Sequence, residues 1–465
     1  MKSSRATENS TQSDNMMQSE ALMQHCIGAM EKAGADACDV VLHSGTDMTY
    51  GQRLGKPETV ERSQSAQIEL RALVAAEDGY RQAIVSSDDL RHETVNMLIE
   101  RVVEMAKVVP ADPHTGLADS KLLVQPQDRK DLSLCDEYVP EIDQLKAWAA
   151  EAEDSALAIK GVTNSDGANA GFEQGRVWLA TSAGFSGQHD YTTFSVSASV
   201  VAGSAGQMET DYDFSYARHC EDLRSPAEIG KIAGERAVNR LHPKRMPTGK
   251  LPVIFDARVA RSLLGAFSGA INGAAIARGT SFLKDAMGQG VFSSDINVMD
   301  DPLRVRGLAS EPFDAEGVAG KKMALVKDGV LQTWLLDTRT ANQLGLTTTG
   351  HASRGSGGAP HPSSSNLYME AGSVSVKELI ADIKQGFFVT DVFGMGVNGV
   401  TGDYSQGAAG FWIDSGEIVF PVSEMTIAGN LKEMFRQLTP ADDLVFHYGT
   451  NCPTVRIEGM TVAGL

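Results

Sequence analysis

The sequence predicts an α+β fold, with an N-terminal helix-sheet-helix domain and a larger C-terminal β-rich domain of layered antiparallel hairpins. Segments with helical periodicity and segments with strand alternation come in clusters, whereas a doubly wound parallel sheet would need them to alternate strictly. Two C-terminal hairpins share one design, because apolar alternation on both arms flanks Asp328-Gly329 in the first and Ser415-Gly416 in the second. These observations favour sheets built from hairpins.

The N-terminal part predicts one compact unit. Its elements are a helix over 20–35, strands over 38–52 and 65–87, and an amphipathic helix over 88–109. The strand pattern of 65–87 contains an Asp78-Gly79 turn, which makes it a hairpin. We therefore expect a disordered leader over 1–18 and an α+β domain over 19–110. Residues 111–140 are polar, contain several prolines and lack a period, which predicts a surface linker.

The rest of the chain predicts two further regions. A middle region over 141–245 contains helical patterns at its two ends and alternating strands between them. The C-terminal β-rich domain covers 246–465 and begins with the buried strand LPVIF. The helix that follows, over 256–278, is rich in small residues. We expect Gly265, Gly269 and Gly273 to permit close packing there, so that Gly269→Leu would cost about 1–3 kcal/mol.

Composition excludes several classes of function. The chain has 465 residues, with 60 acidic and 41 basic side chains and a net charge of -19, so it repels nucleic acid and anionic membranes. Its five cysteines show no CxxC spacing, which is typical of a reduced compartment rather than a secreted disulfide framework. The sequence contains no signal-peptide pattern and no apolar run long enough to span a membrane. We expect a cytoplasmic protein.

Two motifs of catalytic or cofactor-binding type are incomplete. The GxGxxG at Gly394–Gly399 is followed by further glycines instead of a helix, so it predicts a loop between strands rather than a dinucleotide site. The His92-Glu93 pair is followed by Asn96 and Met97, so neither HExxH nor HExxxH is formed. The chain also contains no GxSxG and no P-loop.

The loop over 351–365 combines histidine, arginine and serine with glycine and proline. An independent hydrolase built on its histidines and serines is one hypothesis, although catalysis needs more rigid placement than this composition provides. A loop that shapes a groove or an interface is the alternative that we prefer. The residues that we expect to face a peptide or a partner are Arg354, Ser363, Ser364, Ser365, Asn366 and Gly269.

Three long stretches carry a resemblance to a known family. RGTSFLKDAMGQGVFS, SSSNLYMEAG and GDYSQGAAGFWIDSGEIVFPVSEMTIAGNLKEMF occur in this order and resemble the C-terminal half of the TldD/PmbA family, known as modulator of DNA gyrase peptidases. They are most similar to its PmbA branch, also called TldE. The N-terminal unit and the middle region fit the family's layout, so the resemblance covers residues 21–465.

The resemblance implies a division of labour between two kinds of subunit. In this family the TldD branch holds zinc through an HExxxH motif and a cysteine nearer the C-terminus. The PmbA branch lacks the histidine pair and associates with TldD in a cytoplasmic protease that acts on unfolded proteins and small peptides. The corresponding helix here falls within 259–278 and contains no His, Glu, Asp or Cys. Cys452 lies near the position of the family's cysteine and could be a remnant ligand.

We therefore expect a non-catalytic subunit of a TldD-type metalloprotease complex, with no catalytic residue and no cofactor of its own. The resemblance places zinc in a TldD-like HExxxH partner and implies peptide or unfolded-protein substrates. Alone, the chain could form a homodimer. The alternatives are the independent hydrolase using the loop over 351–365 and a stand-alone peptide-binding or scaffold protein.

Overall fold

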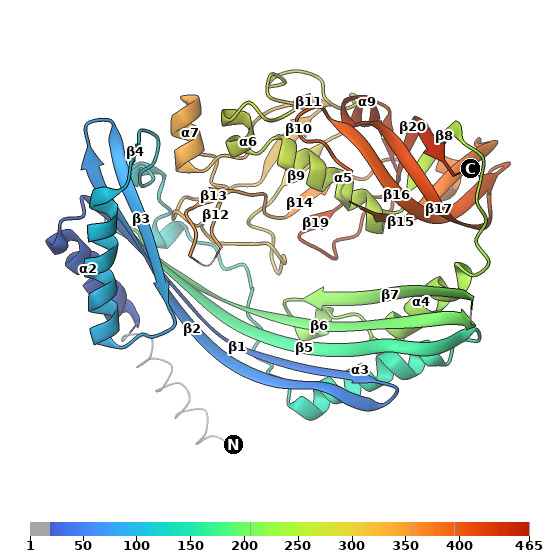
Figure 1. The fold of residues 1–465 in the computed structure, drawn as a ribbon, viewed down its shortest axis with the longest axis horizontal. Coiled ribbons are helices and arrows are strands. Elements are labelled where there is room, and N and C mark those ends of the chain that lie inside the picture. The colour runs from blue at the N-terminus through green and yellow to red at the C-terminus, as the bar shows by residue number, and fades with distance from the viewer. Residues whose placement is uncertain (1–18, 205, 356, 395, 465) are drawn as a thin grey trace.

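The computed structural model describes residues 19–464 except 205, 356 and 395, and it confirms the α+β fold (Figure 1). The expected leader over 1–18 lies outside the described residues. A long, curved antiparallel sheet lies below a C-terminal β-rich half in this view. The chain within the described range thus consists of a sheet with helices on its outer side and a second body on its inner side.

The long sheet has the order β4-β3-β2-β1-β5-β6-β7. Its strands are β1 (Ala37–Arg53), β2 (Lys56–Ala76), β3 (Gly79–Ser87), β4 (Ala111–Asp112), β5 (Val162–Thr181), β6 (Ser186–Ser204) and β7 (Gln207–Ala217). β1 pairs with β5 from Asp39 opposite Thr181 to Gln52 opposite Ala168. The segments 19–110 and 141–245 therefore contribute to one continuous sheet.

Helices cover the convex face of this sheet. They are a helix over 19–33, α2 (His92–Val108), α3 (Ile142–Leu157) and α4 (Pro226–Asn239). Even-numbered residues of β1 point to this face, because successive side chains of a strand alternate. Val40 and Leu42 pack under α2 and the N-terminal helix, whereas Met48 and Tyr50 belong to the core under α3 and α4. The odd-numbered side chains of β1 point to the concave face.

The C-terminal half contains a small closed set of strands and a second sheet. β8 (Gly249–Phe255), β15 (Gln385–Phe393), β16 (Asp403–Asp414), β17 (Glu417–Asn430) and β20 (Val455–Ala463) pair in a ring, since β17 also pairs with β20, and β18 (Leu438–Pro440) adds to β20. The second sheet is β11 (Val330–Leu331), β10 (Met323–Lys327), β9 (Val298–Asp300), β14 (Leu367–Met369) and β19 (Thr450–Asn451). β12 (Ala352–Ser353) and β13 (His361–Pro362) form a short ladder. The helices are α5 (Ala257–Ala270), α6 (Gly273–Ala277), α7 (Thr338–Leu344), α8 (Val376–Ile380) and α9 (Leu431–Arg436).

The two predicted C-terminal hairpins are confirmed. Asp328 and Gly329 join β10 to β11 with φ values of 50° and 75°, and Ser415 and Gly416 join β16 to β17 with 53° and 80°. Positive φ at both turn residues is the requirement of a type I′ turn, which matches the twist of the two strands. The glycine-rich segment after β15 leads into β16 and not into a helix, as the sequence predicts for the described residues.

The segment over 111–140, expected as a linker, packs between the long sheet and the C-terminal half. Leu123 and Val124 are buried, and the backbone of Leu123 forms a bridge with Val318. These residues share an apolar cluster with Val41 and Leu179 of the sheet and with Phe185 and Phe313. The cluster ties the concave face of the sheet to the C-terminal half.

Two networks of ion pairs join the same two bodies. At one end, Arg354 donates from Nη1 to Asp39 (2.8 Å) and Glu69 (3.3 Å), and Asp39 also pairs with Arg71. We call these four residues the Arg354 clamp. Their side chains are at most 4% exposed. The guanidinium groups of Arg354 and Arg71 hold the pKa of Asp39 below its ordinary value against the effect of burial.

The second network lies at β7. Arg258 of α5 donates to Asp211 at 2.9 Å, and Arg240, directly after α4, binds Asp211 at 3.2 Å and Asp391 of β15 at 3.3 Å. The side chain of Asp211 is 3% exposed. We call this set the Asp211 network. Each network therefore places a nearly buried carboxylate on the long sheet against an arginine that the C-terminal half supplies.

The Arg354 clamp can be tested by removing its cation. Arg354→Met should lower the free energy of unfolding by about 3–5 kcal/mol, because two buried carboxylates lose a partner. The control is Arg339→Met, which breaks the half-exposed pair with Asp112 and should cost at most about 1 kcal/mol. Urea unfolding followed by circular dichroism measures both. Equal losses in the two variants would contradict the account.

Candidate functional site

Helix α5 presents two different faces. Asp256 caps it by accepting from the backbone N of Arg258 at 2.9 Å. Val259, Leu263, Leu264 and Phe267 are among the residues that it buries in the C-terminal core. The other face carries the exposed residues Ser262, Gly265 and Gly269. This face offers hydroxyl and backbone groups but no side chain that binds zinc.

The expectation of close packing along this helix is wrong for two of its three glycines. A Cβ at Gly265 or Gly269 would meet nothing within 4 Å. Only Gly273, in α6, is tightly packed, since a Cβ there would lie 2.7 Å from the carbonyl oxygen of Leu335. The predicted single helix also breaks after Ala270, where the side chain of Asn272 caps α6. The predicted cost of Gly269→Leu from overpacking therefore does not follow.

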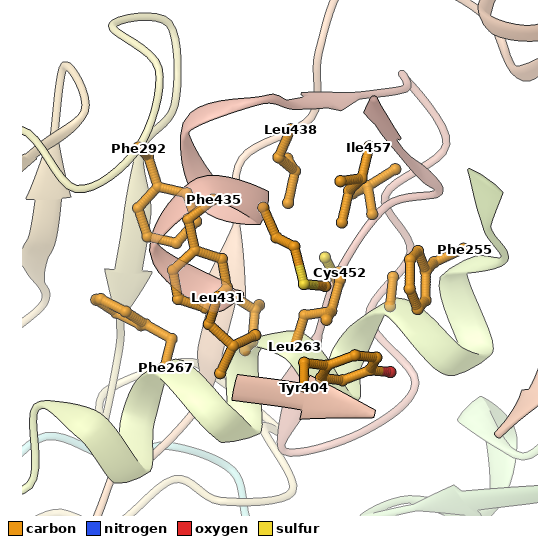
Figure 2. Close-up of a cluster of buried hydrophobic side chains, with 14 of the residues drawn as sticks. Phe255, Leu263, Phe267, Phe292, Tyr404, Leu431, Phe435, Leu438, Cys452 and Ile457 are labelled. Atoms are coloured by element: carbon orange, nitrogen blue, oxygen red, sulfur yellow. The ribbon is translucent and has the colours of Figure 1, made fainter. Parts of the chain in front are cut away.

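Cys452 lies inside the apolar core of the C-terminal half. Figure 2 shows its thiol among Leu263, Tyr404 and Ile457, and its side chain belongs to the same cluster as Phe255. Burial raises the pKa of this thiol far above its ordinary value, with a smaller contribution from Asp443. Among the described residues, no group of three or more His, Cys, Asp or Glu side chains around it could hold a metal ion. Helix α5 and Cys452 together therefore supply one side chain that can bind zinc, whereas a zinc site takes at least three from the protein.

The serine-rich loop is fixed by one buried carboxylate. Asp300 of β9 accepts from the backbone N of Ser365 at 2.8 Å, from its hydroxyl, and from Nε2 of His351 at 3.1 Å. Nδ1 of His351 contacts the hydroxyl of Thr349 at 2.9 Å. A serine hydrolase needs the imidazole between the serine and the carboxylate. Here Ser365 and His351 each bind Asp300 directly, and the second ring nitrogen of His351 contacts Thr349, so the imidazole does not lie between the serine and the carboxylate and the arrangement is that of a structural support.

The other residues expected to face a peptide or partner are placed as follows. The Ser363 hydroxyl contacts the carbonyl of Ser364 at 3.3 Å, and Ser268 of α5 donates to the Ser364 hydroxyl at 3.3 Å. Asn366 is 1% exposed and binds the backbones of Ala309 and Asp301. Arg354 is buried in its clamp, and Gly269 is exposed on α5. The structure brings Ser364 to α5, holds Ser365 on Asp300 of β9, and uses Asn366 inside the fold.

A pocket of about 350 Å³ lies between the concave face of the long sheet and the C-terminal half, and we call it the concave pocket. Its ionisable lining residues include His43, Glu173, His189, Arg218, Glu311, Asp314 and Arg354, and its apolar ones include Val41, Leu134, Val177, Leu179 and Phe313. Sequence reasoning identified only Arg354 among them. The others come from three strands and three loops, and their alternation on β1, β5 and β6 was the available signal.

The pKa values of the histidines and of Glu311 in this pocket are shifted from their ordinary values. Burial lowers the pKa of His189 to about 4, with a further decrease from Arg218, and it lowers the pKa of His43 together with the charge of Arg354. The surrounding protein raises the pKa of Glu311 to about 7, although its side chain is open to the pocket. At neutral pH the histidines are therefore neutral, and the arginines carry the positive charge.

Comparison with known proteins shows which family the chain belongs to. Its residues 38–106, 136–241 and 248–464 match the domain 1, central domain and C-terminal domain of the PmbA/TldA metallopeptidases. The metalloprotease PmbA of Escherichia coli O157:H7 is 34% identical, over 92% of this chain and 93% of that protein. The chain belongs to the PmbA/TldD metallopeptidase family. A PmbA homologue from Haemophilus influenzae is 33% identical over 96% of this chain and 97% of its own length.

Solved structures share the fold of this PmbA-family chain. A modulator of DNA gyrase from Bacteroides thetaiotaomicron has a TM-score of 0.87 at 25% identity, with 96% of this chain and 99% of that chain covered. TldE from Thermococcus kodakarensis has a TM-score of 0.82 at 21% identity, with 95% and 100% covered, which shows the fold alone. In the described part of the chain, no helix combines the length and the apolar character that crossing a bilayer would need.

Below the concave pocket, the PmbA-family chain buries two neighbouring carboxyl groups. Glu316 accepts from the backbone N of Thr338 at 2.9 Å and from its hydroxyl at 2.7 Å, and Asp314 accepts from the backbone N of Val318 and Ala352. Burial raises the pKa of both carboxyl groups, and for Glu316 the charge of Asp314 adds to the effect. The folded chain therefore holds protons here that the unfolded chain releases.

Alanine substitutions of the glycines in α5 and in α6 should change the free energy of unfolding in opposite directions. Gly265→Ala and Gly269→Ala should each raise the free energy of unfolding by about 0.5–1 kcal/mol, because alanine favours a helix and the added methyl group has open space. Gly273→Ala should lower it by about 1–3 kcal/mol through overpacking. Denaturant titration of the three variants decides the matter, and a loss of stability in Gly265→Ala would show that this face is packed.

The buried carboxyl pair predicts a pH dependence. A group whose pKa is raised on folding stabilises the chain below its unfolded pKa, and this contribution is lost as the pH rises through its folded pKa. Glu316→Gln keeps the acceptor for Thr338 and removes the titration, so it should gain stability relative to the parent from about pH 5 to about pH 8. Glu417→Gln, at an exposed position, should track the parent. Thermal unfolding across this range measures both, and a parallel course for Glu316→Gln and parent would refute the assignment.

Proposed function

We propose that this chain is the non-catalytic subunit of a cytoplasmic metalloprotease complex whose zinc lies in a TldD-like partner with an HExxxH motif. The complex would act on peptides and unfolded proteins, and this chain would complete the chamber and line part of the substrate's path. The observation that carries the proposal is the exposed face of α5. In a metallopeptidase family, this helix has no zinc ligand, and its exposed side carries Ser262, Gly265 and Gly269.

The chemistry of the remaining groups supports this assignment. Cys452 is held protonated in an apolar core, and the histidine of the serine-rich loop is held by Asp300 and Thr349. A helix face without large side chains leaves room for an extended peptide to approach the backbone of α5. The concave pocket adds polar and apolar lining residues between the long sheet and the C-terminal half. These features suit contact with a substrate more than bond cleavage.

Co-expression tests the proposal. The chain should co-purify with an HExxxH protein of the same genome, and zinc should follow that partner at about one ion per partner chain. Peptide hydrolysis should require both chains and should be abolished when the Glu of the partner's HExxxH motif is replaced by Gln. The control is the partner with an exposed carboxylate replaced. Hydrolysis by this chain alone, or retention of zinc by this chain alone against a mild chelator, would contradict the proposal.

A further inference from the structure

Glu311 is a carboxylate of the concave pocket that is open to solvent and has no partner. Its side chain is exposed and lines the pocket. Within the described part of the chain, no group donates a hydrogen bond to its carboxylate or forms an ion pair with it. Burial raises its pKa to about 7, and only the charge of Arg218 acts in the opposite direction. An ionised Glu311 therefore lacks a cation in direct contact.

The two arginines of the pocket have no accessible donor for an anion. Each guanidinium nitrogen of Arg218 already donates to a backbone carbonyl oxygen, and the acceptors are Gly307, Thr192 and Leu308. Arg354 is bound in its clamp through Nη1, and its Nε and Nη2 are closed to solvent. An anion, or the anionic end of a zwitterion, would therefore find no cationic partner in the pocket.

The charges around the pocket favour a cation. The Arg354 clamp contains two arginines and two carboxylates, so as a unit it is neutral. Arg218 interacts with the carboxylates of Glu173 and Glu311, and its single charge balances only one of them. Asp314, which interacts with Glu311, adds negative charge when it loses its proton. Because the histidines of the pocket are neutral, ionisation of Glu311 leaves an excess negative charge that a bound cation would neutralise.

The size and the walls of the pocket indicate an organic cation. In the described part of the chain, no group of three or more His, Cys, Asp or Glu side chains could hold a metal ion. Val41, Val177 and Leu179 line the sheet side and Phe313 lines the opposite side, and the volume of about 350 Å³ is that of a small-molecule site. We propose that the concave pocket binds a small organic monocation with an apolar body, such as an arylalkylamine, with its ammonium at the carboxylate of Glu311. This site does not depend on the proposed protease partner, so it can be tested on the chain alone.

Calorimetric titration of the isolated full-length chain with phenethylamine tests the site. It is done at about pH 8, where most of Glu311 is ionised because its pKa is about 7. One amine should bind per chain. Phenethyl alcohol keeps the apolar body without the charge, and hydrocinnamate carries a negative charge, so each should bind at least about tenfold more weakly. Equal affinity for the three ligands, or absence of binding at about 10 mM amine, would overturn the proposal.

The pH dependence of binding provides a second readout. A protonated Glu311 cannot pair with an ammonium group, so the affinity for phenethylamine should fall about tenfold between about pH 8 and about pH 6. The affinity for phenethyl alcohol should stay constant over the same range, because that ligand makes no ion pair. A constant affinity for the amine would contradict the assignment of its ammonium to this carboxylate.

A matched pair of variants tests the residue itself. Glu311→Gln removes the charge and keeps the shape, and it breaks no hydrogen bond within the described residues, so it should unfold thermally like the parent. It should bind phenethylamine at least about tenfold more weakly, lose the pH dependence, and bind phenethyl alcohol unchanged. Glu417→Gln, at an exposed position of β17, should bind all ligands like the parent. Undiminished binding of the amine to Glu311→Gln would overturn the proposal.

Discussion

The need to neutralise charge on the concave face of the long sheet shapes the rest of the molecule. Asp39 and Arg71 lie opposite each other on β1 and β2, with Glu69 beside them, and all three are nearly inaccessible. Arg71 alone cannot balance two carboxylates, and a buried charge without a partner is costly. Covering this face with the C-terminal half therefore requires an additional cation, which Arg354 supplies. Arg354 is thus part of the interior, although an arginine in a loop rich in glycine and serine would be expected at the surface.

The Asp211 network likewise pairs a nearly buried carboxylate of the long sheet with arginines, here on β7. It also covers the edge of the sheet. β7 is the last strand of the long sheet. The carbonyl oxygen of Tyr212 accepts from Arg258 at 3.2 Å, and that of Phe214 accepts from Arg224. An exposed edge invites pairing with another chain, and these arginines occupy its acceptors. A peptide that pairs with β7 would have to displace them, so the surface of α5 and the concave pocket are better suited to contact a substrate.

Local chemistry explains which features could be predicted from the sequence. The turns at Asp328-Gly329 and Ser415-Gly416 depend on adjacent residues that tolerate positive φ, so the sequence pattern was sufficient. The pairing of β1 with β5 joins residues more than a hundred positions apart, and alternation shows that each is a strand without showing which strand it meets. The face of α5 posed a related difficulty, since small residues are compatible both with close packing and with an open surface. In the candidate site, Arg354 was identified by its residue type, whereas Glu311 and His189 needed the sheet to bring them together.

The central claim is that the two ion-pair networks and the apolar cluster around Phe313 make the long sheet and the C-terminal half one cooperative unit. Differential scanning calorimetry of the isolated chain tests this most directly. The account predicts a single transition, whose calorimetric and van't Hoff enthalpies agree, and its separation into two transitions when Arg258 and Arg354 are both replaced by methionine. Two resolved transitions in the parent protein would contradict the account, because the two bodies would then unfold independently.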